Sequence, residues 1–116
     1  QLVLDLVELR GQIARKVDAL NKLVYISGPY TAPTKLGIES NINAAREVAL
    51  WCAENRIFYF CPHLNSAHFE LWKDVPTSFY YAMDEEILSR CDAMIILPRW
   101  ETSKGVVSEI EYCRIN

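Results

Sequence analysis

Three short runs of almost uninterrupted apolar residues alternate with longer stretches of helical periodicity. The runs at 22–27, 56–61 and 93–97 are rich in β-branched and aromatic residues, and a Gly or Pro follows each of them. Strands that are apolar on both faces are typical of a parallel sheet covered by helices on each side. The pattern therefore predicts an α/β fold, a flavodoxin-like or Rossmann-like three-layer sandwich built on a parallel sheet.

The stretches between and after these strands predict helices. Helical spacing of apolar residues indicates helices over 41–54, from Thr77 to about Arg90, and from about Gly105 to the end of the chain. Ser40 and Thr77 have the side chains that favour an N-cap, so we expect them to start the first two. We expect residues 62–76 to be irregular.

The first twenty residues have a different pattern. Residues 2–20 show a heptad-like spacing of apolar positions, which predicts an amphipathic N-terminal helix. This helix either packs on the domain or pairs with a second copy, and periodicity cannot separate the two. We therefore expect a segment at 1–21 ahead of one domain at 22–116, and a homo-oligomer. The apolar positions of the spacing are Leu2, Leu6, Leu9, Ile13 and Leu20.

Composition narrows the functional classes. The 116 residues are 51% hydrophobic with a formal net charge of -3, which argues against binding of a nucleic acid polymer through a basic stripe. The chain has neither a membrane-length apolar run nor a secretory signal, so we expect a cytoplasmic protein without a membrane partner. Its four cysteines and two histidines lack metal-ligand spacing. They predict reduced, mostly buried thiols, no metal and no cofactor.

Parallel sheets bind ligands at the carboxyl ends of their strands, where loops meet helix N-termini. Three segments, 28–35, 62–70 and 98–109, should meet there. Ser103, Lys104 and Gly105 open the last helix and can favour an anion or a sugar hydroxyl. Glu109 lies one turn further on, near the strand ends. It is either a reactive carboxylate or an acid that stabilises the helix dipole.

Three more residues are candidates for chemistry, each with a structural alternative. Asp84 lies at the edge of an apolar helix face, where it is either a partly desolvated acid with a raised pKa or a solvated one. Tyr25, near the end of the first strand, either packs in the core or holds a carboxylate by its phenol. His63 is either a loop histidine or a contact to a base or sugar.

The order and spacing of these pieces resemble the nucleoside 2-deoxyribosyltransferase-like superfamily, which includes the 2'-deoxynucleoside 5'-phosphate N-hydrolases. The similarity is strongest to its short bacterial and phage branch and covers roughly residues 22–113. The pieces that carry it are Tyr25-Ile26-Ser27-Gly28-Pro29-Tyr30, Asn41, Cys61-Pro62-His63, Tyr80-Tyr81-Ala82-Met83-Asp84, Cys91-Asp92-Ala93-Met94-Ile95, and Ser103-Lys104-Gly105 with Glu109.

The resemblance implies roles for the three candidate catalytic residues. Glu109 matches the nucleophile that attacks the anomeric carbon and forms a covalent glycosyl-enzyme. Asp84 matches the acid that protonates the departing base, and Tyr25 matches the tyrosine that orients the nucleophile. The implied ligand is a small nucleoside or nucleotide, with Ser103 and Gly105 in the loop that holds the sugar or its 5'-phosphate and Gly28 and Pro29 in the loop under the sugar. We also expect contacts to this ligand from Ser27, Tyr30, Asn41, His63 and Lys104.

The chain departs from this family pattern at two positions. Lys104 brings a cation into the loop before the nucleophile, and the phosphate-binding arginine of the nucleotide hydrolases has no match at Tyr30.

Two other hypotheses about function stay open. One is a module that binds a nucleotide or a nucleotide-derived signal without turning it over. The other is an assembly protein that works through its 2–20 helix.

Overall fold

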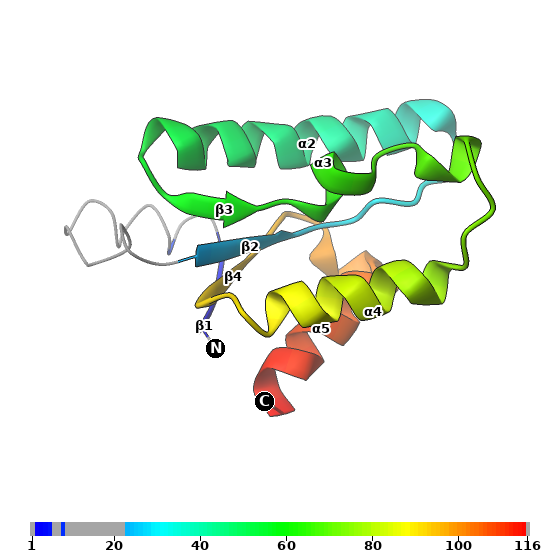
Figure 1. Ribbon diagram of the computed structural model, residues 1–116. Helices are drawn as coiled ribbons and strands as arrows, with labels where there is room; N and C mark the ends of the chain where they lie inside the picture. Colours follow the sequence, from blue (N-terminus) through cyan, green and yellow to red (C-terminus); the bar gives the residue numbers. More distant parts are fainter. Residues whose placement is uncertain (1, 6–7, 9–22, 116) are drawn as a thin grey trace.

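A four-stranded parallel sheet forms the centre of the protein (Figure 1). The computed structural model describes residues 2–5, 8 and 23–115. The strands lie in the order β1-β4-β2-β3, so β2 and β4 are the two central strands. Their bounds are Leu2–Leu4 for β1, Leu23–Ser27 for β2, Phe58–Phe60 for β3 and Ala93–Ile96 for β4.

Helices cover both faces of the sheet. In Figure 1, α2 and α3 lie above the sheet, and α4 and α5 lie below it. The expected α/β sandwich of three layers is therefore confirmed. The helices are α2 (Lys35–Glu54), α3 (Pro62–Ser66), α4 (Thr77–Leu88) and α5 (Lys104–Ile115), with short 3-10 helices at Phe69–Leu71 (η1) and Trp100–Thr102 (η2).

The alternation of side chains along β2 divides the core into two layers. Successive residues of a strand point to opposite faces of the sheet. Val24 and Ile26 accordingly pack in the cluster that includes the buried side of α2. Tyr25 packs in the opposite cluster with Met94 and the buried side of α5. Every residue from Val24 to Ser27 is buried, as the predicted two-faced strand requires.

The start of the predicted N-terminal helix is wrong. Leu2–Leu4 form strand β1, which pairs with β4 at one edge of the sheet. Leu4 is buried in the core, because three consecutive apolar residues are better covered in a sheet than on one helix face. Glu8 is helical, and its backbone N–H donates to Asp5 Oδ1 over 2.8 Å, a contact typical of a helix start. Most of the remaining predicted helix lies outside the described residues.

Helix starts also differ from the expectation. Helix α2 begins at Lys35, and its N-cap is Thr34, whose Oγ1 accepts a hydrogen bond of 3.1 Å from Gly37 N–H. Ser40 therefore lies inside the helix. Gly37 belongs to the first turn, where a Cβ would lie 2.6 Å from the Cβ of Ala32. Glycine there reflects close packing and does not signal a loop.

Proline explains the other two differences in helix boundaries. Thr77 is the first residue of α4, and Pro76 occupies the N-cap position. Pro62 lies in the first turn of α3, where proline is favoured because its missing N–H has no helical partner. The segment 62–76, expected to be irregular, thus contains α3 and η1.

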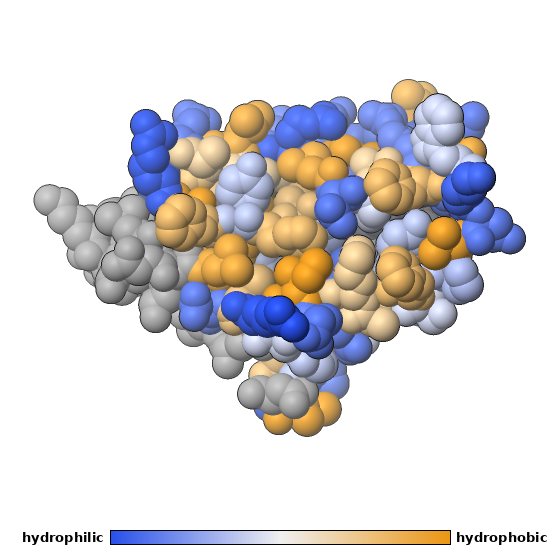
Figure 2. All heavy atoms as spheres, viewed as in Figure 1, coloured by the Kyte–Doolittle hydropathy of each residue, from blue (hydrophilic) through white to orange (hydrophobic). Residues whose placement is uncertain are grey.

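Apolar side chains gather on the face that carries the edge strand β3. Figure 2 shows them in orange and tan across the middle of the molecule, between α2 and α4. Exposed aromatic residues include Phe58, Trp72 and Phe79, with Trp72 80% exposed. Apolar patches of this kind are typical of contact surfaces.

Within the described part of the chain, no helix combines the length and the apolar character that a membrane crossing needs.

The close approach of two strand ends makes a first prediction. A Cβ at Gly28 would lie 2.5 Å from Cδ1 and 2.9 Å from Cγ of Leu97, which is itself buried. We expect Gly28→Ala to lower the free energy of unfolding by about 1–3 kcal/mol through overpacking. Chemical denaturation followed by circular dichroism measures this change.

Gly105→Ala is the matched control. Its new Cβ would find no atom closer than 3.8 Å, and alanine favours helix α5. We expect it to be neutral or slightly stabilising. Equal denaturation midpoints for the two variants would contradict the packing role of Gly28.

Candidate active site

The end of β2 and the first turns of α5 bring three polar side chains together. Tyr25 and Ser27 lie two residues apart on β2 and therefore point to the same face of the sheet. The Tyr25 hydroxyl donates a hydrogen bond to Oε2 of Glu109. The Ser27 hydroxyl donates to Oε1 over 2.7 Å. Both oxygens of one carboxylate are thus held by neighbouring residues of one strand.

Glu109 lies on the side of α5 that faces the sheet. The buried residues of this helix are Val106, Ile110 and Cys113, and Glu109 falls three residues after the first and four before the last. The helix begins at Lys104, and the Oγ of Ser103 accepts a hydrogen bond of 3.3 Å from Val106 N–H. The fold therefore directs a carboxylate into the core side of the helix, beneath the carboxyl end of β2.

Asp84 supplies a second carboxyl from α4. The side chain is half-buried, and it shares a helix face with Tyr80 and Leu88, four residues away on either side. Burial first, and then the charge of Glu109, raises the pKa of Asp84 to about 7. The two acids, 25 residues apart in the chain, therefore interact electrostatically within one site.

Hydrogen bonds and burial act in opposite directions on Glu109. Burial raises the pKa of its carboxyl, as does the charge of Glu85, whereas the hydrogen bonds from Tyr25 and Ser27 lower it. Two donors on two different oxygens match the ionised carboxylate. Burial and the charges of Glu109 and Asp84 raise the pKa of Tyr25, so its phenol stays protonated. Burial has the larger effect, so the pKa of Glu109 is raised on balance, while the two hydrogen bonds favour its ionised form.

The loop after β2 is braced through its backbone carbonyls. Asn41 Nδ2 donates to the carbonyl oxygen of Tyr30 over 3.0 Å. His63 Nε2 lies 2.8 Å from the carbonyl oxygen of Pro29, to which it can only donate. Burial lowers the pKa of His63, so its ring is neutral and Nδ1 is an acceptor. This Nδ1 is buried and has no hydrogen-bond partner among the described residues.

A second set of contacts, which the sequence did not indicate, holds Tyr30. Its hydroxyl donates to Oε1 of Glu70 over 2.9 Å and accepts a hydrogen bond of 2.9 Å from His68 N–H. His68 Nε2 also contacts Oε1 of Glu39, near the start of α2. The three segments that carry these residues are linked only by tertiary contacts, which local spacing cannot reveal. Tyr30 and Glu70 thus join the loop after β2 to the segment at η1.

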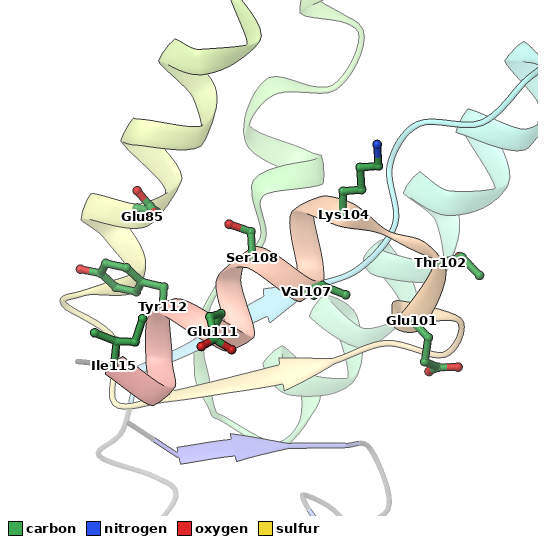
Figure 3. Close-up of a pocket in the computed structure, with 9 residues that line it drawn as sticks. All are labelled: Glu85, Glu101, Thr102, Lys104, Val107, Ser108, Glu111, Tyr112 and Ile115. Carbon is green, nitrogen blue, oxygen red and sulfur yellow. The ribbon is translucent and has the colours of Figure 1, made fainter.

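The start of α5 also borders a groove on its other side. Figure 3 shows this groove, with Glu85 on α4 and Lys104, Ser108 and Tyr112 along α5. Lys104 lines it together with Glu101, whereas Asp84 and Glu109 do not line it. Gly105 has the ring of Tyr81 as a neighbour, 3.9 Å from the position of a Cβ. Ser103, Lys104 and Gly105 were expected to contact the ligand. Ser103 caps α5, Lys104 lines the groove, and Gly105 lies in the first turn of the helix.

Metal-binding groups are few in the region that the structure covers. Among the described residues, no three His, Cys, Asp or Glu side chains are grouped to hold a metal ion. Cys52, Cys61, Cys91 and Cys113 are free and buried, as the sequence predicts.

Comparison with known proteins gives one match. The sequence model of a family described as "Domain of unknown function (DUF7768)" matches residues 22–116. The chain belongs to this family. The DUF7768 region holds β2, α4 and α5, which carry the residues of the site, whereas β1 lies before it. None of the curated proteins and none of the solved structures compared with the chain matches it.

The raised pKa of Asp84 makes a prediction about stability. An aspartate whose pKa is higher in the folded state binds an extra proton there between about pH 4 and pH 7, so stability falls as pH rises through that window. Asp84→Asn removes this penalty. We expect the variant to gain on the order of 1–2 kcal/mol over the natural protein at pH 8, after allowance for solvent exposure, and little at pH 4.5.

Urea denaturation at the two pH values measures this difference. Asp74→Asn, which changes an exposed acid outside the site, is the control and should show no pH-dependent gain. An equal effect of Asp84→Asn at both pH values would contradict the raised pKa of Asp84.

Proposed function

We propose that this protein cleaves the N-glycosidic bond of a nucleoside or nucleotide through a covalent glycosyl intermediate on Glu109. One observation carries the proposal: a carboxylate held by two hydroxyl donors interacts electrostatically with a second carboxyl, whose pKa is raised to about 7. A pair of acids with separated pKa values is typical of glycosidic chemistry, in which one acts as nucleophile and the other as acid. The resemblance to the nucleoside deoxyribosyltransferase-like superfamily suggests the same roles.

The reaction proceeds by two displacements. A Glu109 oxygen forms a bond to the anomeric carbon while the C–N bond breaks, and the departing base takes its electron pair and a proton from Asp84. Water or a second base then attacks the anomeric carbon, and the Asp84 carboxylate takes up a proton from it. Glu109 leaves unchanged, and configuration is retained. Water as acceptor gives hydrolysis, and a second base gives base exchange.

The loop after β2 is the proposed wall beneath the sugar. Pro29 and Tyr30 are held by His63 and Asn41, which keeps this loop close to the carboxyl end of β2. A rigid loop reduces the entropy lost when the substrate is oriented.

Four free thiols suit a reducing compartment, and we place the reaction in the cytoplasm. The expected homo-oligomer stays a prediction.

Release of free base tests the proposal. The protein is incubated with a panel of ribo- and deoxyribonucleosides and their 5'-phosphates, and free base is measured by liquid chromatography. We expect release from at least one substrate, and Glu109→Gln should lower its rate by roughly a thousandfold or more because no nucleophile remains. Glu111→Gln, at an exposed position two residues further along α5, is the matched control.

Two outcomes of this assay would count against the proposal. Base release that survives Glu109→Gln would exclude Glu109 as the nucleophile. Tight binding of a nucleotide that is recovered unchanged, and that also survives Glu109→Gln, would favour a module that binds without turnover.

The dependence of the rate on pH gives a further prediction. Asp84 must carry a proton to serve as the acid, and its pKa is about 7. We therefore expect kcat/KM to fall as pH rises above about 7. Asp84→Asn should lower kcat by roughly 10²–10⁴-fold and remove this alkaline limb of the profile. A variant that keeps the limb would show that another group donates the proton.

A further inference from the structure

Ser27 is in a position that a substrate ligand would not take. Its side chain is 1% exposed, and its hydroxyl donates to Oε1 of Glu109 over 2.7 Å. Tyr25, two residues earlier, donates to the other oxygen. A serine hydroxyl has only one proton to donate. That proton is already donated to Glu109, so the Ser27 hydroxyl has no further hydrogen to donate to a sugar or a base.

The two donors together fix the carboxylate. One hydrogen bond would let the carboxyl group rotate about its last side-chain bond, whereas bonds to both oxygens from one strand hold its plane. Each oxygen keeps a further lone pair for attack, because a carboxylate offers about four acceptor sites. Hydrogen bonds to an ionised acceptor are also stronger than those to a neutral one, so both donors favour the charged form.

We propose that Ser27 is a positioning residue, which holds Glu109 ionised and in one orientation, and is not a substrate ligand. Its part in catalysis rests on the proposed role of Glu109 as nucleophile. Without Ser27, Oε1 loses its donor, and the carboxyl proton becomes harder to remove. Glu109 then competes with Asp84 for the single proton of the pair, and the division between nucleophile and acid is weakened.

Ionisable groups on β2, α4 and α5 interact with Glu109. Tyr25 acts on it from β2, and Asp84 and Glu85 act from α4. Cys113, one turn along α5, also interacts with it. Among these groups, Tyr25 alone donates a hydrogen bond, whereas burial and the charge of Glu85 raise the pKa of Glu109. The Ser27 hydroxyl is therefore one of two donors that offset them.

Direct titration of Glu109 without substrate tests the inference. Protein labelled with ¹³C at glutamate carboxyls is titrated by NMR, and the Glu109 signal is assigned as the one absent from Glu109→Gln. We expect Ser27→Ala to raise the pKa of Glu109 by about one unit, as should Tyr25→Phe. Cys52→Ala, a comparable truncation at a buried site on the opposite face of the sheet, should leave that pKa unchanged.

Kinetics with an accepted substrate adds a second readout. We expect Ser27→Ala to lower kcat about tenfold and to leave KM nearly unchanged, because Ser27 positions the nucleophile and does not bind the substrate. The acid limb of the pH profile should shift to higher pH. An unchanged pKa of Glu109 in Ser27→Ala would overturn the inference, whatever the activity. Absence of base release by the natural protein would overturn the proposed function alone, because the titration needs no substrate.

Discussion

A carboxylate on the sheet side of a helix is costly unless hydrogen-bond donors meet it. Glu109 is in this situation, and the donors come from the end of β2, where Tyr25 and Ser27 point to the same face. Most of the site follows from this contact. It joins α5 to the central strand β2, it favours the ionised form of Glu109, and it places this carboxylate at the carboxyl end of β2, where ligands bind in parallel sheets.

The topology explains why the contact lies there. Strands β2 and β4 are neighbours, yet the chain after β2 enters α2 on one face of the sheet, and the chain after β4 enters α5 on the other (Figure 1). Loops that leave in opposite directions open a crevice at the carboxyl ends of the two strands. Leu97, which follows β4, packs so closely against Gly28 that no side chain fits there. The same edge therefore combines tight packing around Gly28 with the carboxylate of Glu109.

The sequence predicts those parts of the fold that local patterns encode. Strands β2 and β4 are continuous apolar runs and were predicted nearly to the residue, whereas Leu2–Leu4 was assigned to a helix because Leu2 also fits a heptad. The early start of α2 is not predicted by helical spacing over 41–54, because Gly37 lies ahead of that pattern and its lack of a Cβ serves packing against Ala32. Short helices begun by a proline, such as α3, carry little periodicity.

The site was predicted in part for similar reasons. The spacing of Glu109 from Val106 and Cys113 puts it on a buried helix face, and this is a signal that the sequence contains. The i, i+2 relation of Tyr25 and Ser27 is another, because it places both hydroxyls on the same face of the sheet. The link between Tyr30 and Glu70 has no such signal, because 40 residues separate its partners.

Trapping of the covalent intermediate tests the role of Glu109 as the nucleophile. A nucleoside that carries fluorine at the 2' position destabilises the cationic transition states, and with a good leaving base it allows the glycosyl-enzyme to accumulate. The protein is treated with such a compound, digested and analysed by mass spectrometry. We expect a fluorinated glycosyl group on the peptide that contains Glu109, and none in Glu109→Gln. Release of the base without an adduct on Glu109, or with one on a different residue, would contradict this role.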